Sequence, residues 1–79
     1  MNDNTYNGWK NRETWNVALY IQNDYHLYTL GMSSKNYAEL LAYSYFQRNP
    51  MTPDGVRWDS RKVCRSEINA MLRELRGER

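Results

Sequence analysis

The chain has 79 residues, a length that makes one domain and leaves no room for a second hydrophobic core. Its single cysteine excludes a disulfide within the chain, and with only one histidine beside it a zinc site is not expected. The net charge of +2 and the pI of 8.8 fall below the values of a strongly basic, nucleic-acid-binding domain.

Aromatic residues make up 14% of the sequence and include three Trp and seven Tyr. Each such ring can bury roughly 150–250 Å². We therefore expect bulky rings to compensate for the small size of the core. Those tyrosines that the core does not use would be available for an interface, where Tyr and Trp are enriched.

The N-terminal residues 1–5 are polar and lack the basic and apolar regions of a secretory signal. No apolar run approaches the roughly 20 residues of a membrane span. With the single free cysteine, these features predict a cytoplasmic protein without a membrane partner. We expect a flexible N-terminus over 1–6, a single helical domain over 7–77 and a C-terminal tail at 78–79.

A polar helix start follows the turn signal Asn7-Gly8. Asn11 is the predicted N-cap, and Glu13 suits the positive end of the helix dipole. The apolar residues that follow cover one broad arc at about 100° per residue, which predicts a helix from about residue 12 to residue 22. We expect Trp9 to fold back onto this helix, and we interpret the polar groups at 10–14 as caps and not as a catalytic cluster.

Two further helices are predicted in the middle of the chain. Residues 25–30 are expected to form a short helix or turn that ends near Gly31. Residues 35–47 are expected to form one longer helix, capped at Ser33-Ser34. Because its C-terminal half is apolar nearly all round, this helix is predicted to be central in the bundle or to carry an interface.

The C-terminal third begins with a loop, since Pro50 ends the preceding helix and Pro53-Asp54-Gly55 is typical of a tight turn. The last helix is predicted from about residue 60 to residue 76 with Asp59 as its cap; Ser66 is an alternative start. No strand is indicated. The predicted fold class is all-α, a compact small bundle of three longer helices plus one short helix.

The candidate contact surface combines an aromatic anchor with basic side chains. Trp58 follows a Pro/Gly loop and adjoins Arg57, and Trp and Arg dominate interface hot spots. Alternatively, Trp58 belongs to the core. One flank of the last helix is basic and would meet an acidic protein surface or phosphates, unless it is an ordinary solvated face. The predicted partner-binding residues are Trp58, Arg57, Tyr43, Phe46, Arg61, Lys62, Arg65 and Arg73.

The remaining tyrosines can be interpreted in more than one way, whereas the single histidine and the single cysteine are given a structural role. The tyrosines would form a stacking platform for bases, or would wrap the core with their hydroxyls in water. Tyr43 and Phe46 would alternatively form a homodimer seam. His26 is predicted to be a packing residue, and Cys64 an inert buried thiol. Since no acid/base pair, phosphate loop or metal cluster is recognisable, we expect neither an enzyme nor a cofactor.

Residues 7–24 read N-G-W-K-N-x-E-T-W-N-V-A-L-Y-I-x-N-D. This motif resembles the opening of a family of small proteins encoded mainly by tailed phages, including phages of cyanobacteria. The loop T-P-D-G-V at 52–56 is similar to one in the same family. The resemblance implies a phage origin and offers no catalytic residues to carry over.

Small phage proteins without an active site commonly act on host proteins. The resemblance therefore leads to the hypothesis of a non-enzymatic protein that binds a host factor in the host cytoplasm and modulates or inhibits it. One alternative is a nucleic-acid-associated module that uses the basic flank of the last helix. A second alternative is a structural homodimer.

Overall fold

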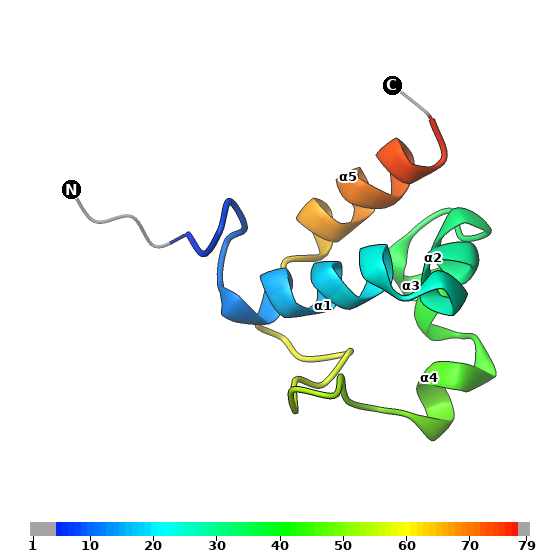
Figure 1. The fold of residues 1–79 in the computed structure, drawn as a ribbon, viewed down its shortest axis with the longest axis horizontal. Coiled ribbons are helices and arrows are strands. Elements are labelled where there is room, and N and C mark those ends of the chain that lie inside the picture. Colours follow the sequence, from blue (N-terminus) through cyan, green and yellow to red (C-terminus); the bar gives the residue numbers. More distant parts are fainter. Residues whose placement is uncertain (1–4, 78–79) are drawn as a thin grey trace.

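The computed structural model describes residues 5–77, and five α-helices lie within this range (Figure 1). In place of strands, this range contains two isolated β-bridges, Tyr6–Trp9 and Met51–Arg57. The fold is therefore all-α, as predicted. Residues 1–4 and 78–79, which we assigned to the N-terminus and the C-terminal tail, lie outside the described residues. The helices are α1 (Arg12–Asn23), α2 (Tyr25–Met32), α3 (Tyr37–Leu41), α4 (Ser44–Arg48) and α5 (Arg65–Leu75).

Helix α1 begins and ends close to the predicted residues. The Asn11 side chain accepts a hydrogen bond from the Thr14 N–H at 2.9 Å, which confirms the predicted N-cap. Val17, Ala18 and Ile21 are fully buried. The apolar arc of the sequence therefore matches the core-facing side of α1 only in part, because Trp15 and Leu19 are half-buried whereas the polar residue Asn16 is fully buried.

A tight turn at Asn7-Gly8 precedes α1. Both residues have positive φ, at 50° and 88°, which is the conformation that Asn-Gly favours in a two-residue hairpin. Tyr6, which we expected to belong to a flexible terminus, exchanges two backbone hydrogen bonds with Trp9 across this turn. Its ring centroid lies 5.0 Å from that of Trp15. Trp9 packs against the core, as the predicted fold-back requires.

The single helix predicted over 35–47 is wrong, because the chain forms two short helices there. Tyr43 is extended, with φ −66° and ψ 146°, and separates α3 from α4. At the C-terminal end of α3, the Tyr43 N–H donates a hydrogen bond to the Leu40 carbonyl. The Gln47 side-chain amide donates another to the Leu41 carbonyl, which has no partner within the helix. The arrangement of three longer helices and one short helix is therefore not what the chain forms.

The start of the last helix also differs from the main prediction. Helix α5 begins at Arg65 with Cys64 as its N-cap, one residue from the alternative start at Ser66. Asp59 does not cap it but pairs with Arg57. Residues 60–64 form a turn that places Val63 in the core, at 5% exposure. The long connection from residue 49 to residue 64, here called the return loop, is consequently longer than the sequence indicated.

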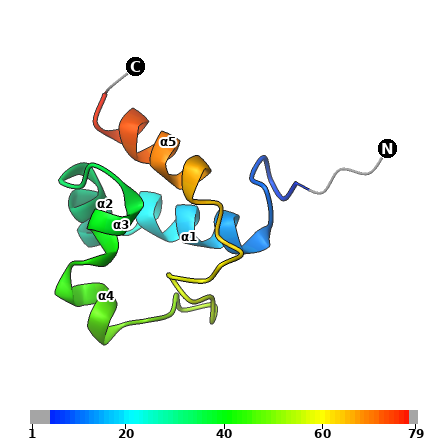
Figure 2. The same ribbon diagram turned by 180° about the vertical axis from the view of Figure 1, so that it is seen from behind.

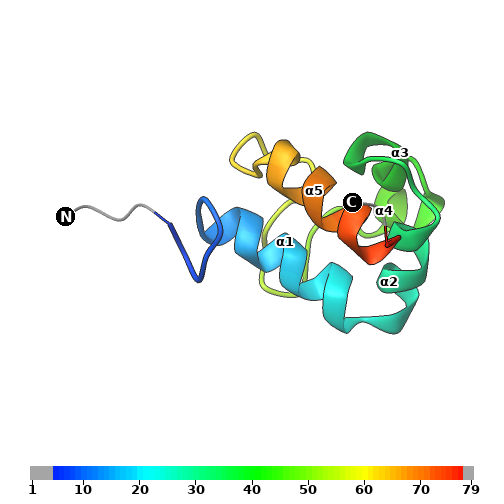
Figure 3. The ribbon, with the colours of Figure 1, turned by 90° about the horizontal axis from the view of Figure 1, so that it is seen from above.

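The core lies where α1, α2, α3 and α5 meet the return loop. Helix α1 contacts α2 and α5, and α3 contacts α5. The return loop runs along α1 from the far side of the molecule to the start of α5 (Figures 1 and 2). From above, α5 lies alongside α1, with α2 and α3 at one end (Figure 3). The return loop and α4 add Phe46, Val56, Trp58 and Val63 to the core.

Candidate functional site

The first half of the return loop is fastened to α1 by Asn16. This side chain is fully buried, and its Oδ1 accepts a hydrogen bond from the Thr52 hydroxyl at 2.7 Å. Its Nδ2 donates to the Asp54 carboxylate, also at 2.7 Å. The Thr52 hydroxyl oxygen accepts the Val56 N–H at 3.1 Å. Because a buried amide needs such partners, Asn16 fixes the position of residues 52–56.

The second half is fastened at the start of α1. The Asn11 amide donates to the Lys62 carbonyl at 2.7 Å. The Thr14 hydroxyl donates to Asn11 Oδ1 at 2.6 Å and accepts the Cys64 N–H at 2.8 Å. The capping residues of α1 therefore also hold residues 62–64. Between these two fastened points, in the displayed segment 57–61, Trp58 is buried and Ser60 is half-buried. The side chains of Arg57, Asp59 and Arg61 are exposed.

A hollow of about 180 Å³ lies beside the displayed segment. Its floor includes Trp58 and Phe46, which are 2% and 5% exposed and whose rings meet edge-to-face at 5.0 Å. The buried Trp58 Nε1 has no hydrogen-bond partner among the described residues. An unpaired buried donor costs about 1–3 kcal/mol, a cost that an acceptor reaching Trp58 Nε1 would remove. This Trp58 hollow is lined by Leu41, Phe46, Gln47, Pro50, Arg57, Trp58 and Asp59.

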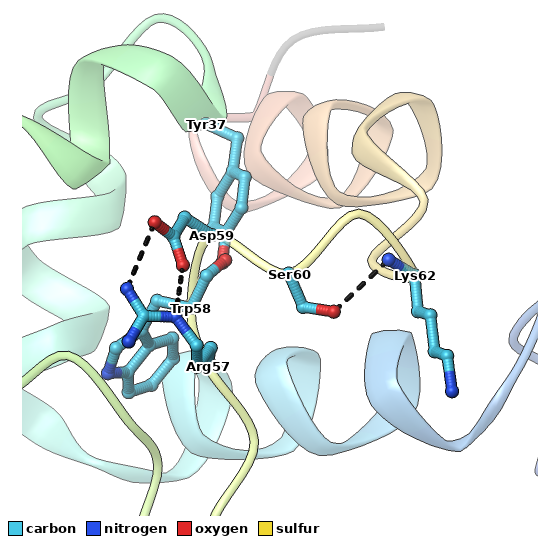
Figure 4. Close-up of polar contacts among 6 residues, drawn as sticks. All are labelled: Tyr37, Arg57, Trp58, Asp59, Ser60 and Lys62. Atoms are coloured by element: carbon cyan, nitrogen blue, oxygen red, sulfur yellow. Dashed lines mark hydrogen bonds and ion pairs between the residues drawn. The ribbon is translucent and has the colours of Figure 1, made fainter.

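An ion pair forms the rim of the Trp58 hollow. Arg57 Nε lies 2.9 Å from Asp59 Oδ1, and Arg57 Nη2 lies 3.3 Å from Asp59 Oδ2 (Figure 4). The hydrogen bond from Arg57 lowers the pKa of the Asp59 carboxyl, and Asp59 in turn raises the pKa of Arg57. Because both side chains are more than half exposed, this pair orients the guanidinium and adds little stability.

A second hollow, of about 290 Å³, shares Arg57 with the first. Arg12 comes from the start of α1, while Ser60 and Lys62 come from the return loop. The Ser60 hydroxyl accepts the Lys62 N–H at 3.1 Å (Figure 4). Arg12 and Lys62 form no ion pair with any residue from 5 to 77. This Lys62 hollow is lined by Arg12, Glu13, Gly55, Val56, Arg57, Ser60 and Lys62.

A third hollow, of about 260 Å³, lies by the N-terminal turn. It is lined by Gly8, Trp9, Gln22, Glu67, Ala70, Met71 and Glu74, so its titratable groups are acidic. We call it the Trp9 hollow.

The predicted contact residues are only partly brought together. Phe46, Arg57 and Trp58 line the Trp58 hollow, and Lys62 lines the adjoining one. Of the two interpretations of Trp58, the structure supports the core residue and not the partly exposed anchor, because its ring is only 2% exposed. Phe46 is buried in the same way, so it does not present its ring to a partner. Both rings instead form the floor of a recess.

The other four predicted residues are spread more widely. The Arg65 guanidinium lies over the buried Tyr37 ring, 5.2 Å from its centroid. Tyr43 is half-buried, and Arg61 is an exposed residue of the return loop. Arg73 lies about two turns beyond Arg65, roughly 12 Å along α5. The basic flank is therefore a scattered set, and only its N-terminal part adjoins the hollows.

Sequence reasoning missed Asp59, Gln47 and Arg12 as members of this surface. Arg57 and Asp59 lie in a turn, closed by a hydrogen bond from the Ser60 N–H to the Arg57 carbonyl at 3.1 Å, and no signal in the sequence indicated their pairing. Gln47 and Arg12 carried no signal either, because only the packing of α4 and α1 against the return loop places them there.

Cys64 also differs from the prediction of an inert buried thiol. It is half-buried at the start of α5, and its Sγ lies 3.3 Å from the Ser66 hydroxyl oxygen. The hydrogen bond with Ser66, followed by one from the backbone of Glu67, lowers the pKa of the Cys64 thiol.

Residues 5–77 hold no group of three His, Cys, Asp or Glu side chains that would bind a metal ion. No helix in this range has the length and apolarity needed to cross a membrane.

The fold and its hollows define a small all-α domain whose displayed loop segment carries a recess with a charged rim. The chain belongs to DUF7249, a family of unknown function whose model matches residues 2–78. No curated protein matches the chain. No solved structure matches it either.

Proposed function

We propose that this chain is a small non-enzymatic protein that acts by binding another protein through the Trp58 hollow and its Arg57–Asp59 rim. The observation that carries this proposal is the size and lining of the hollow. At about 180 Å³ it is smaller than the ~300–1,000 Å³ of typical small-molecule sites. Its apolar floor and polar rim suit a single side chain projecting from a protein partner.

The mechanism would be steric. A side chain of the partner enters the hollow, and the Arg57 guanidinium, oriented by Asp59, fixes the direction of approach. Because the sequence motif is similar to that of tailed-phage proteins, we propose a host protein as the partner. Occupation of its surface would modulate or inhibit that host factor.

Affinity capture from host lysate tests this proposal, with and without nuclease. We compare the tagged wild-type chain with Gln47→Arg, which places a long cation at the exposed wall of the Trp58 hollow. The matched control is Gln22→Arg, which makes the same change at the Trp9 hollow. We expect a stoichiometric, nuclease-resistant partner to be retained by wild type and by Gln22→Arg, and to be lost with Gln47→Arg.

Three results would overturn the proposal. Loss of the captured material on nuclease treatment would point to nucleic acid. Loss with Gln22→Arg but not with Gln47→Arg would move the contact to the Trp9 hollow. Capture of nothing, together with a dimer in sedimentation velocity, would favour a structural homodimer.

A further inference from the structure

The Trp58 hollow and the Lys62 hollow are neighbours, because Arg57 lines both. We propose that together they bind one extended, acidic peptide segment of the partner protein. An apolar side chain of that segment occupies the Trp58 hollow, and its carboxylates meet the cations of the Lys62 hollow. This inference rests on the proposed function and specifies the chemistry of the partner.

The lining of the Trp58 hollow favours an apolar group. Trp58, Phe46 and Leu41 provide its apolar surface, and the buried Trp58 Nε1 lacks an acceptor among the described residues. A peptide brings both kinds of group, since each apolar side chain is attached to a backbone with carbonyl oxygens.

The charges at the Lys62 hollow specify the flanking residues. Three cationic side chains line this hollow, Arg12, Arg57 and Lys62, against one carboxylate, Glu13. Arg57 is engaged by Asp59, whereas Arg12 and Lys62 pair with no carboxylate of residues 5–77. Asp or Glu residues of a bound peptide would complement this excess.

A nucleic acid would also be attracted by these cations, but the aromatic residues favour a peptide. Bases bind single-stranded sites by stacking on exposed ring faces. Trp58 and Phe46 are 2% and 5% exposed and pack against each other, so neither offers a free face.

Selection from a random linear peptide library on the immobilised full chain tests the inference. We expect the enriched peptides to share an apolar residue with Asp or Glu a few positions away. Synthetic peptides of this kind should bind Gln47→Arg about tenfold or more weakly than wild type, because the anchor can no longer enter. Enrichment of basic peptides, or no shared pattern, would overturn the inference.

A charge-reversal pair tests the acidic part separately. The double variant Arg12→Glu/Lys62→Glu should weaken binding by about threefold or more and remove the preference for Asp and Glu. Its control is Lys35→Glu/Arg73→Glu, which has the same net charge but alters exposed residues elsewhere. Equal weakening by both double variants would show a general effect of net charge and refute a specific acidic site.

The tryptophan indole N–H signals in NMR spectra give a direct readout of the anchor. The chain has three tryptophans, so Trp58→Phe assigns the signal of Trp58 by its disappearance. A selected peptide should move the Trp58 indole signal as its N–H gains an acceptor. Movement of only the Trp9 or Trp15 signal would overturn the assignment of the hollow.

The inference and the proposed function can fail separately. If a host protein is captured in a manner that depends on Gln47, but no acidic peptide is selected, the partner presents a folded surface. The proposed function then stands and the peptide inference is refuted. If nothing is captured and no peptide is selected, both are refuted.

Discussion

Removal of the Asn16 side chain is the sharpest test of how this fold displays its candidate site. Asn16 lies in the middle of α1, is fully buried, and bonds to Thr52 and Asp54 of the return loop. Asn16→Ala removes both hydrogen bonds in a single step. The return loop would then lose its attachment at residues 52–56, next to the segment that carries Arg57 and Trp58.

The expected loss of stability follows from the two bonds. The neutral bond with Thr52 is worth about 0.5–1.5 kcal/mol, and a bond to a carboxylate about 1.5–3 kcal/mol. Because Asp54 is exposed and water can replace its partner, the lower end of that range applies to it. We expect a loss of about 2–3 kcal/mol. A domain of this length has a total stability of about 4–12 kcal/mol, so the effect would be large.

Urea unfolding followed by tryptophan fluorescence measures this loss. Asn23→Ala is the control, since it makes the same change at an exposed residue at the end of the same helix. In Asn16→Ala, hydrogen exchange at the Val56 amide should also accelerate, because its acceptor is the Thr52 hydroxyl. If the two variants agree within about 0.5 kcal/mol, Asn16 does not hold the loop.

Three further predictions concern other parts of the molecule. Burial raises the pKa of the Tyr37 hydroxyl above its ordinary range. Above about pH 10 the unfolded chain therefore binds fewer protons than the folded chain, and the free energy of unfolding falls by up to about 1.4 kcal/mol per pH unit. In urea unfolding at alkaline pH, Tyr37→Phe should flatten this decline, whereas Tyr25→Phe, at an 81% exposed position, should not. Gly31→Val should cost about 1–3 kcal/mol in the same assay, because even a methyl group there lies 3.2 Å from a leucine of α5. Because the hydrogen bond with Ser66 lowers the pKa of the Cys64 thiol, alkylation by iodoacetamide should show its midpoint at a lower pH than for a cysteine in a short unstructured peptide, and Ser66→Ala should raise that midpoint.

Local signals in the sequence were sufficient for the turn and the start of the first helix. The Asn7-Gly8 turn and the Asn11 cap each depend on interactions within a few residues, and both were predicted correctly. The apolar arc of α1 was predicted only in part, since Trp15 and Leu19 are half-buried while Asn16 is fully buried. The break between α3 and α4 has no such signal. Tyr43 is neither Gly nor Pro, and its extended conformation is selected because it lets Tyr37 and Phe46 both reach the core.

For the candidate site, the sequence indicated the residue types but not their exposure. Composition and neighbourhood indicated Arg57 and Trp58 as interface residue types, and the structure places them at one recess. Their exposure could not be read from the sequence, because it depends on residues far away in the chain. The Tyr37 hydroxyl donates to the Trp58 carbonyl at 2.5 Å, and Phe46 packs on the indole, so contacts over long sequence separations bury this ring.

The sequence motif, with its two parts at residues 7–24 and 52–56, contributes to the scaffold more than to the Trp58 hollow. Asn11, Thr14 and Asn16 belong to its first part, Thr52 and Asp54 to its second, and in the structure these two parts bond to each other. The side chains that line the Trp58 hollow all lie outside both parts. At the Lys62 hollow, Glu13, Gly55 and Val56 belong to the motif, whereas the cationic side chains Arg12, Arg57 and Lys62 stand at positions that the motif leaves open or does not include. The two parts of the motif therefore hold the return loop against α1, while the Trp58 hollow and the cations beside it come from other positions. The identity of the partner should therefore be sought in the residues between the two fastened points, and in those of α4 that face them.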